Sequence, residues 1–346
     1  MIRICSSLSG SGHEVYLVGR RLPESAPLAS RAFRQKRLRC FFRKGKLFYL
    51  EYNLRLLLYL LSQKMDIIHA VDLDTILPAV ICKRWKGVRV IYDAHEYFTE
   101  TPEVVRRPLV QRVWSKVADW AVPRVDAAFS VGPALAGIMS ERYDRPFGCV
   151  RNVPMARPFP ERDKREQPPV ILYQGALNEG RGLETMIRAI PDIPHVQLWL
   201  AGEGDLSGSL RQQVAAQPAL KDRIRFLGFL RPEDLAAITP RATLGLNLLE
   251  NTGLSYYYSL ANKAFDYIQA GVPAIHMNFP EYRTLADRYG AIALLDELSP
   301  TRLARLINDL LDSPNRLEQL RAECKNAAPL LTWEREERAL LRYYIF

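Results

Sequence analysis

Two side chains in the first half of the sequence could act on a hydroxyl group. Asp72 and His95 each follow a short apolar run, at residues 66–70 and 88–92. A histidine titrates near neutral pH and can hydrogen-bond a hydroxyl group, and a carboxylate can orient or deprotonate one. If both runs are parallel strands, both side chains project into the crevice at the carboxyl ends of the strands, where ligands bind. A helix cap for Asp72 and a structural turn for His95 are the alternatives.

A further polar group lies at the start of a helix in the second half. Residues 255–273 hold a tyrosine triplet, an amphipathic stretch and a Gly-x-Pro stop, so we expect a helix capped by Asn262 or Ser259. Gly271 suits the left-handed position after such a helix. Asp266 would lie in the first turns, near the positive end of the helix dipole, where an anion or polar ligand is readily held. The alternative is an exposed aspartate on an amphipathic helix.

The elements that position these residues alternate between short apolar strands and helices, which is typical of a parallel sheet covered by helices. Strands are expected at residues 13–18, 66–70, 88–92, 126–131, 169–174, 196–201, 225–230 and 244–249. Helices are expected at residues 1–9, 49–63, 102–122, 300–315 and 315–327. A proline-rich stretch without periodicity indicates a linker. We therefore expect an N-terminal domain (1–154), a linker (155–168), a C-terminal domain (169–329) and a final helix (330–346) that crosses back.

The beginning of the sequence departs from the usual pattern. A doubly wound domain opens with a strand and a glycine-rich turn into its first helix. Here residues 1–9 read as a helix, and Gly10 and Gly12 break it. We expect the first domain to lack its opening strand and the sequence to start late. No G-x-G-x-x-G follows a strand, so dinucleotide binding is not indicated.

The composition is that of a folded protein with more than one domain. The chain has 346 residues, 48% hydrophobic and 25% charged, enough for two domains of ordinary size. Five scattered cysteines without a C-x-x-C pair argue for a reducing compartment and against a structural zinc site. No secretory signal follows Met1, and the longest apolar run, residues 54–61, is far shorter than the roughly 20 residues that span a bilayer.

Positive charge gathers in the first half. Residues 1–150 carry 24 Lys and Arg against 14 Asp and Glu, whereas residues 151–346 carry 24 of each, so the net charge of +10 belongs to the first half. Much of it lies in Arg31–Lys46, which holds eight basic residues, three phenylalanines and no acid. This mixture suits an anionic membrane surface, at about 1 kcal/mol per basic residue. Nucleic acid would suit it too, but no nucleic-acid motif accompanies it. A solvated basic loop or helix face is the alternative.

Several motifs together resemble one enzyme family. K-A-F-D-Y-I-Q-A-G-V-P, which starts at Lys263, looks like the K-x-F-[DE]-Y-x-x-x-G-x-P segment of bacterial glycosyltransferases with the GT-B fold, in particular the retaining family-4 group. Four other motifs also resemble the family and stand in the family order along the chain: D-A-H-E at Asp93, R-N-V-P at Arg151, R-G-L-E at Arg181 and W-E at Trp333. The resemblance covers nearly the whole chain.

The resemblance implies roles for particular residues. Asp266 would hold the ribose hydroxyls of a nucleotide sugar, and Arg181 would bind its diphosphate. Breaking a sugar–phosphate bond leaves negative charge on the diphosphate, which a guanidinium and helix N–H groups stabilise. His95 would lie beside the transferred sugar, oriented by Glu96. The other donor contacts implied are Gly175 and Gly182, which permit close backbone approach, together with Lys263, Gly228 and Phe229.

Two positions depart from the family pattern. Many relatives carry a second cation just after the first glycine of the phosphate turn, where this chain has Ala176. Diphosphate binding would therefore depend more on Arg181 and Lys263. Relatives often carry E-x7-E, but the position of the first glutamate is Tyr258 here. Sugar recognition would then use other groups, such as Glu250, Asn262 or loop amides.

We therefore predict an α/β protein with two Rossmann-like doubly wound domains that face a cleft, with the donor on the second and the acceptor on the first. The reaction implied is transfer of a hexose-type unit, with retention, to a lipid-linked or saccharide acceptor in cell-surface polysaccharide or glycolipid synthesis. No cofactor and no metal are expected beyond the nucleotide sugar, since no D-x-D stands beside the diphosphate site. The basic first domain suits a cytoplasmic protein at the inner face of the plasma membrane.

Two other functions compete with this one. A non-catalytic sugar-nucleotide-binding or scaffold protein would agree with Ala176, Tyr258 and the missing strand. It would bind nucleotides without turnover. A sugar-nucleotide epimerase of the same fold is a third reading, which product analysis without acceptor would separate.

Overall fold

The computed structural model describes residues 1–160 and 166–345, and these residues form two compact units. The first unit is Met1–Arg151 with Arg335–Phe346, and the second is Asn152–Glu334. Of the expected linker, residues 161–165 lie outside the described part of the chain, as does residue 346 of the expected final helix.

The first unit contains two parallel sheets instead of one. β1 (Tyr16–Arg21) pairs with β2 (Arg34–Arg39), and a separate sheet has the order β3-β4-β5-β6. The strands of the second sheet are β3 (Ile67–Val71), β4 (Arg89–Ala94), β5 (Ala127–Ser130) and β6 (Phe147–Cys149). The described chain begins with helix α1 (Ile2–Gly10), as expected.

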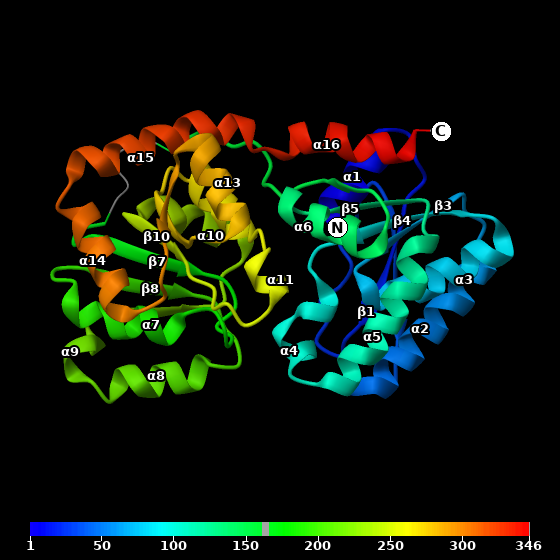
Figure 1. The fold of residues 1–346 in the computed structure, drawn as a ribbon, viewed down its shortest axis with the longest axis horizontal. Coiled ribbons are helices and arrows are strands. Elements are labelled where there is room, and N and C mark those ends of the chain that lie inside the picture. Colours follow the sequence, from blue (N-terminus) through cyan, green and yellow to red (C-terminus); the bar gives the residue numbers. More distant parts are fainter. Residues whose placement is uncertain (161–165, 346) are drawn as a thin grey trace. The chain divides into compact units, whose positions relative to one another are not determined.

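Helices surround the larger sheet of the first unit (Figure 1). They are α2 (Gly45–Ser62), α3 (Ile76–Lys86), α4 (Pro102–Val105), α5 (Pro108–Ala121) and α6 (Pro133–Tyr143). The prediction of one helix at 102–122 is wrong, because the helix is interrupted at Arg106 and Arg107. Pro108 lacks an N–H and disfavours helical backbone at the residue before it, and Arg107 has φ −127° and ψ 81°.

The centre of the basic run at residues 31–46 forms strand β2. The expected alternative of a solvated basic loop or helix face is therefore wrong for this part of the run. Exposed and half-buried residues alternate over the first four positions of β2, and Arg37 and Leu38 are then both half-buried. Phe33 is buried just before the strand, whereas Phe41 and Phe42 after it are exposed. The basic run therefore does not form a single face.

The second unit is a six-stranded parallel sheet with the order β12-β11-β10-β7-β8-β9. Its strands are β7 (Val170–Gln174), β8 (Gln197–Ala201), β9 (Ile224–Gly228), β10 (Leu244–Asn247), β11 (Ala274–Met277) and β12 (Ile292–Leu295). The strand order reverses between β7 and β10, since β8 and β9 lie on one side and β11 and β12 on the other. Open parallel sheets bind ligands at such a switch point, outside the carboxyl ends of the strands.

Helices cover both faces of this sheet. Figure 1 shows α7 and α8 on one side and α10 and α13 on the other. The helices are α7 (Leu183–Ala189), α8 (Ser207–Ala215), α9 (Pro218–Lys221), α10 (Pro232–Ile238), α11 (Leu254–Tyr257), α12 (Asn262–Gln269), α13 (Pro280–Tyr289), α14 (Pro300–Leu311) and α15 (Pro314–Ala327). One continuous apolar core includes Ile171, Leu198, Leu246, Phe265 and Ile307. Helix α16 (Trp333–Leu341) follows, and its residues from Arg335 onward belong to the first unit.

Helix α12 has the predicted end but not the predicted start. Gly271 has φ 64°, in the left-handed region, as expected after a helix. The N-cap residue is Ala261, which carries no side-chain acceptor, so capping by Asn262 or Ser259 is wrong. Ser259 donates to the Tyr256 carbonyl instead, and Asn262 is the first helical residue.

Candidate active site

The turn that follows β7 brings three backbone segments into close contact in the second unit. Gly175 has φ 134°, and its N–H donates to the Ala201 carbonyl at 2.9 Å. A Cβ atom on Gly202 would lie 1.9 Å from the Gly175 carbonyl oxygen. Gly182 has φ 66°, and a Cβ atom there would lie 2.6 Å from the Leu248 carbonyl oxygen. These glycines let the ends of β7, β8 and β10 converge at the switch point.

Two cations lie beside this turn. Lys263 Nζ is 3.1 Å from the point where a Cβ atom of Gly175 would stand, and 3.8 Å from the centre of the Tyr173 ring. The Arg181 guanidinium carbon is 5.1 Å from the centre of the Tyr256 ring. Lys263 Nζ and Arg181 Nε are both buried, and neither has a hydrogen-bond partner among the described residues. Burial, and then the charge of Arg181, hold the pKa of Lys263 well below its usual range.

Asp266 lies on α12, one turn after Lys263, and is half-buried. Its Oδ2 accepts from Gln174 Nε2 at 3.3 Å, and Gln174 Oε1 in turn accepts from Thr239 Oγ1 at 3.0 Å. The last residue of β7 is thus bonded to the acid of α12. Gln174 was not among the predicted site residues. A polar residue that ends a buried strand just before Gly175 was the available signal.

Other predicted donor residues lie at the edges of this cluster. The Glu250 N–H donates to the Gly180 carbonyl at 3.0 Å, which ties the loop after β10 to the glycine turn. Gly228 has φ 69°, and a Cβ atom there would lie 3.5 Å from Glu203. The Phe229 ring is 77% exposed, and Asn262 is exposed on the first turn of α12.

Two predicted residues of the first unit, Asp72 and His95, contact Asp93, which was not among the predicted site residues. The Asp72 carboxylate accepts from the His95 backbone N–H at 2.9 Å, and the Asp72 N–H donates to the Asp93 carbonyl at 2.9 Å. Asp72 makes no side-chain cap bond and has φ 55° and ψ 170°, a backbone region that residues other than glycine rarely adopt. The His95 ring is bonded through Nε2 to Asp93 Oδ2 at 3.0 Å. Glu96 is exposed beside it.

Electrostatics in this cluster favour a charged acid beside the histidine. Burial would raise the pKa of Asp93, but hydrogen bonds from His69 and His95 bring it down to about 2. Burial would lower the pKa of His95, but Asp93, with the charge of Asp72, raises it above its usual value. Burial raises the pKa of Asp72. Burial and the neighbouring Asp72 raise the pKa of Asp74 to about 6. The arrangement can hold a proton near neutral pH.

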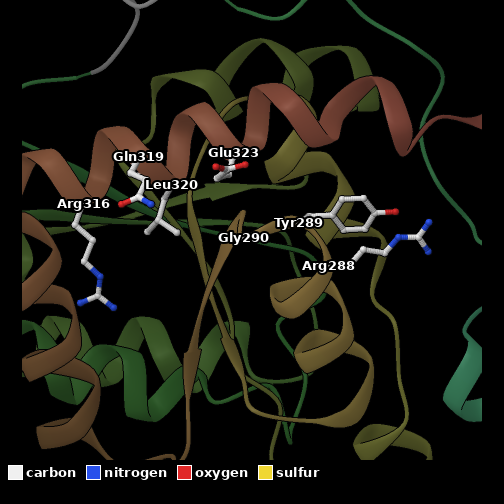
Figure 2. A pocket seen from close by; sticks show the side chains of 7 residues that line it. All are labelled: Arg288, Tyr289, Gly290, Arg316, Gln319, Leu320 and Glu323. Carbon is white, nitrogen blue, oxygen red and sulfur yellow. The ribbon is translucent and has the colours of Figure 1, made fainter.

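A surface hollow of about 430 Å³ lies elsewhere in the second unit (Figure 2). The end of α13 and one face of α15 line it with Arg288, Tyr289, Gly290, Arg316, Gln319, Leu320 and Glu323. It contains none of the predicted site residues. In residues 1–160 and 166–345, no group of three or more His, Cys, Asp and Glu side chains is arranged to hold a metal ion.

Two stretches of the chain match known families. Residues 1–156 match the family described as Glycosyltransferase Family 4, and residues 168–313 match Glycosyl transferases group 1. The chain is 25% identical over 226 residues to the glycogen synthase of Mycobacterium tuberculosis, which covers 63% of this chain and 53% of the relative. The chain therefore spans about half the length of that relative.

Solved structures share the fold over 90% or more of this chain. Sucrose-phosphate synthase of Thermosynechococcus elongatus matches with a TM-score of 0.82 and 17% identity, over 99% of this chain and 91% of that one. HepE of Anabaena, solved in complex with UDP-glucose, matches with a TM-score of 0.71 and 14% identity, over 90% and 86% of the two chains. These likenesses confirm the predicted GT-B fold class.

Proposed function

The chain belongs to the family-4-like glycosyltransferases of group 1, and from this we propose that it transfers a hexose-type unit from a nucleotide sugar to an acceptor hydroxyl. The bond from the sugar C1 to the donor diphosphate breaks, and a bond from C1 to the acceptor oxygen forms. The acceptor proton is lost, and the nucleoside diphosphate leaves. We propose that the new bond has the configuration of the old one, as the resemblance to the retaining family-4 group implies.

The observation that carries this proposal is the pair of buried cationic nitrogens, Lys263 Nζ and Arg181 Nε, beside the Gly175 turn. Arg181 and Lys263 approach the same glycine turn, and two of their nitrogens have no acceptor among the described residues. A diphosphate supplies such acceptors, and its charge increases as the sugar–phosphate bond breaks. Fixed donors aimed at developing charge lower the barrier of such a step. We propose that these cations replace a metal ion and that no cofactor is needed.

The remaining residues divide between nucleotide and sugar. Asp266, bonded to Gln174 at the end of β7, would accept hydrogen bonds from the ribose hydroxyls. The exposed ring of Phe229 and the backbone of Gly228 would lie against the base. In the first unit, His95 would bond a hydroxyl of the transferred sugar, and Asp72 would orient the acceptor. HepE was solved with UDP-glucose, which makes a UDP-sugar the first donor to test.

For the acceptor, we propose a lipid-linked hydroxyl at an anionic membrane surface. Leu47, Leu50, Leu54 and Leu58 form one stripe along α2, and all four are exposed. Arg43, Lys44 and Lys46 stand at the N-terminal end of this helix, which has no acid in its first turn. Cations are unfavourable at that end of a helix, so an anionic surface would offset their cost. Within the described residues, no helix is long and apolar enough to cross a bilayer.

Calorimetric binding of UDP, GDP and ADP tests the donor site, followed by turnover of the matching nucleotide sugars with product analysis. We expect Arg181→Ala to weaken diphosphate binding by about 10- to 150-fold, because a charge-assisted hydrogen bond contributes about 1.5–3 kcal/mol. The control is Arg188→Ala, on the exposed side of α7. If Arg181→Ala binds as well as the parent, the donor site is wrong.

A non-catalytic nucleotide-binding protein of the same fold is the competing proposal. Ala176 and Tyr258, in place of the cation and glutamate of many relatives, favour it. It predicts tight nucleoside diphosphate binding without hydrolysis or transfer, with or without lipid acceptors. Release of free sugar or formation of a glycosylated lipid would exclude it.

A further inference from the structure

A short loop at residues 40–44, between β2 and α2, presents two phenylalanines to solvent. Phe41 is 85% exposed and Phe42 is 46% exposed. Among the large apolar residues of the described chain, Phe41 has the highest exposed fraction. Single exposed apolar side chains are normal, but several gathered in one place mark a contact surface. The loop therefore needs to be considered together with its neighbours.

Side chains from other elements hold the backbone of this loop. The Phe41 N–H donates to both carboxylate oxygens of Glu51, at 2.9 and 2.8 Å, and the Phe42 N–H donates to Glu51 Oε2 at 2.9 Å. The Arg43 carbonyl accepts from the guanidinium of Arg20 at 2.7 Å. Glu51 lies on α2, and Arg20 lies on β1. Three polar backbone groups of the loop are thus satisfied by the protein itself.

The carboxylate of Glu51 is neutralised in its turn. Arg55, four residues later on α2, donates through Nε to Glu51 Oε1 at 2.7 Å, and its guanidinium carbon is 5.1 Å from the centre of the Phe41 ring. Moving an unbonded N–H group or an unpaired charge out of water is costly. A loop whose N–H groups bond to a paired carboxylate can therefore leave water at a lower cost.

The loop continues the leucine stripe of α2. Glu51 lies four residues after Leu47 and three before Leu54, and such spacings place side chains on the same face of a helix. Phe41, which is bonded to Glu51, therefore lies beside that stripe. The two rings and the exposed leucines form one apolar surface.

Exposed cations surround the loop and indicate what covers this surface. They are Arg39, Arg43, Lys44 and Lys46. An anionic bilayer offers acyl chains to the rings and headgroup phosphates to the cations. A second copy of this chain would bring the same cations together, so like charge opposes contact between copies through this loop.

We propose that the loop at residues 40–44 inserts Phe41 and Phe42 at the boundary of headgroups and acyl chains of an anionic bilayer, and that Glu51 holds it in the inserting shape. The inference rests on the proposed membrane acceptor and deepens it, because the rings anchor one end of α2 below the headgroups. A loop that is already ordered loses little conformational freedom on binding. Glu51 is thus a positioning residue for the anchor.

Penetration of phosphatidylglycerol monolayers tests insertion, because adsorption to the headgroups alone does not raise the pressure of a compressed film. We expect Phe41→Ser and Phe42→Ser each to lower the maximum insertion pressure and to weaken binding to phosphatidylglycerol vesicles by about tenfold or more. Phe229→Ser is the matched control for lipid binding, because Phe229 is 77% exposed in the second unit. It should insert and bind like the parent.

Glu51→Ala tests the role of the carboxylate through the sign of its effect. By electrostatics alone, removal of a negative charge strengthens adsorption to an anionic surface. We expect the opposite, about threefold to tenfold weaker vesicle binding, because the loop loses the acceptor of two N–H groups. Glu103→Ala removes an exposed acid from α4 of the same unit and should bind as well as the parent or more tightly. Thermal unfolding checks that both variants fold.

Several results would overturn this inference. Insertion that survives both phenylalanine substitutions would do so even if Leu50→Ser weakens binding and thereby supports the α2 surface. Tighter vesicle binding by Glu51→Ala would show that Glu51 acts only through its charge. Self-association without insertion, abolished by Phe41→Ser in sedimentation, would identify a second copy as the occupant. A parent that binds no anionic vesicles would overturn the membrane acceptor as well, whereas donor binding is measured without lipid.

Discussion

At the scale of single residues, Lys263 links donor binding to pH. Its pKa is held well below the usual range by burial and by Arg181, and a bound diphosphate would raise it again. At a pH between the pKa of Lys263 in the free protein and its pKa in the complex, Lys263 takes up a proton when the diphosphate binds. The affinity for the diphosphate should therefore fall as the pH rises. Calorimetry of UDP binding in buffers with different ionisation heats measures the uptake. We expect Lys263→Met to remove the uptake, and Lys221→Met, an exposed control, to preserve it. Equal uptake in both variants would refute the linkage.

The proposed donor-binding residues could be predicted from the sequence, whereas the residues that hydrogen-bond to site residues could not. Gly175, Arg181 and Lys263 lie in motifs with fixed spacing, and the structure places them around one turn. Asp93 was passed over because its significance depends on His69, which lies on another strand. No local pattern reports such a partner.

At the scale of elements, the left-handed glycine after α12 fixes where that helix ends. Gly271 has φ 64°, and a Cβ atom there would lie 2.5 Å from the Phe159 ring. We expect Gly271→Ala to lower the free energy of unfolding by about 1–3 kcal/mol, because an L-residue in this region costs about 1–2 kcal/mol before any clash. Chemical denaturation measures the change. Gly208→Ala, on α8 with open space around it, should be neutral or slightly stabilising. Similar losses in both variants would contradict this account.

Elements with a strong apolar pattern were predictable, and those without one were not. The buried strands β7 and β8 lie within a residue of their predicted positions. Strand β2 was missed because its Arg, Lys and Gln side chains hide the alternation that a half-buried strand normally shows. The break before α5 follows from Pro108 and could have been predicted.

At the scale of the whole molecule, charge and exposed apolar surface favour attachment to anionic lipid. We expect Leu50→Ser and Leu54→Ser each to weaken binding to phosphatidylglycerol vesicles by about tenfold or more, because burying a leucine side chain contributes about 1.5–3 kcal/mol. Vesicle co-sedimentation measures this, and added salt should weaken binding further. Leu330→Ser, an exposed leucine of the second unit, is the control. Binding that is equally strong to uncharged vesicles, or unaffected by these leucines, would contradict the proposal.

The split sheet of the first unit has a consequence for how copies of this protein behave toward one another. Among the described residues, β2 pairs with β1 alone, so one row of its backbone groups pairs with no other strand. Such an edge is a template for joining another chain, and lysine or arginine side chains on it oppose that association. Arg34, Lys36, Arg37 and Arg39 occupy four of the six positions of β2. The positive charge that would attract the protein to lipid headgroups thus also opposes edge-to-edge aggregation of its copies.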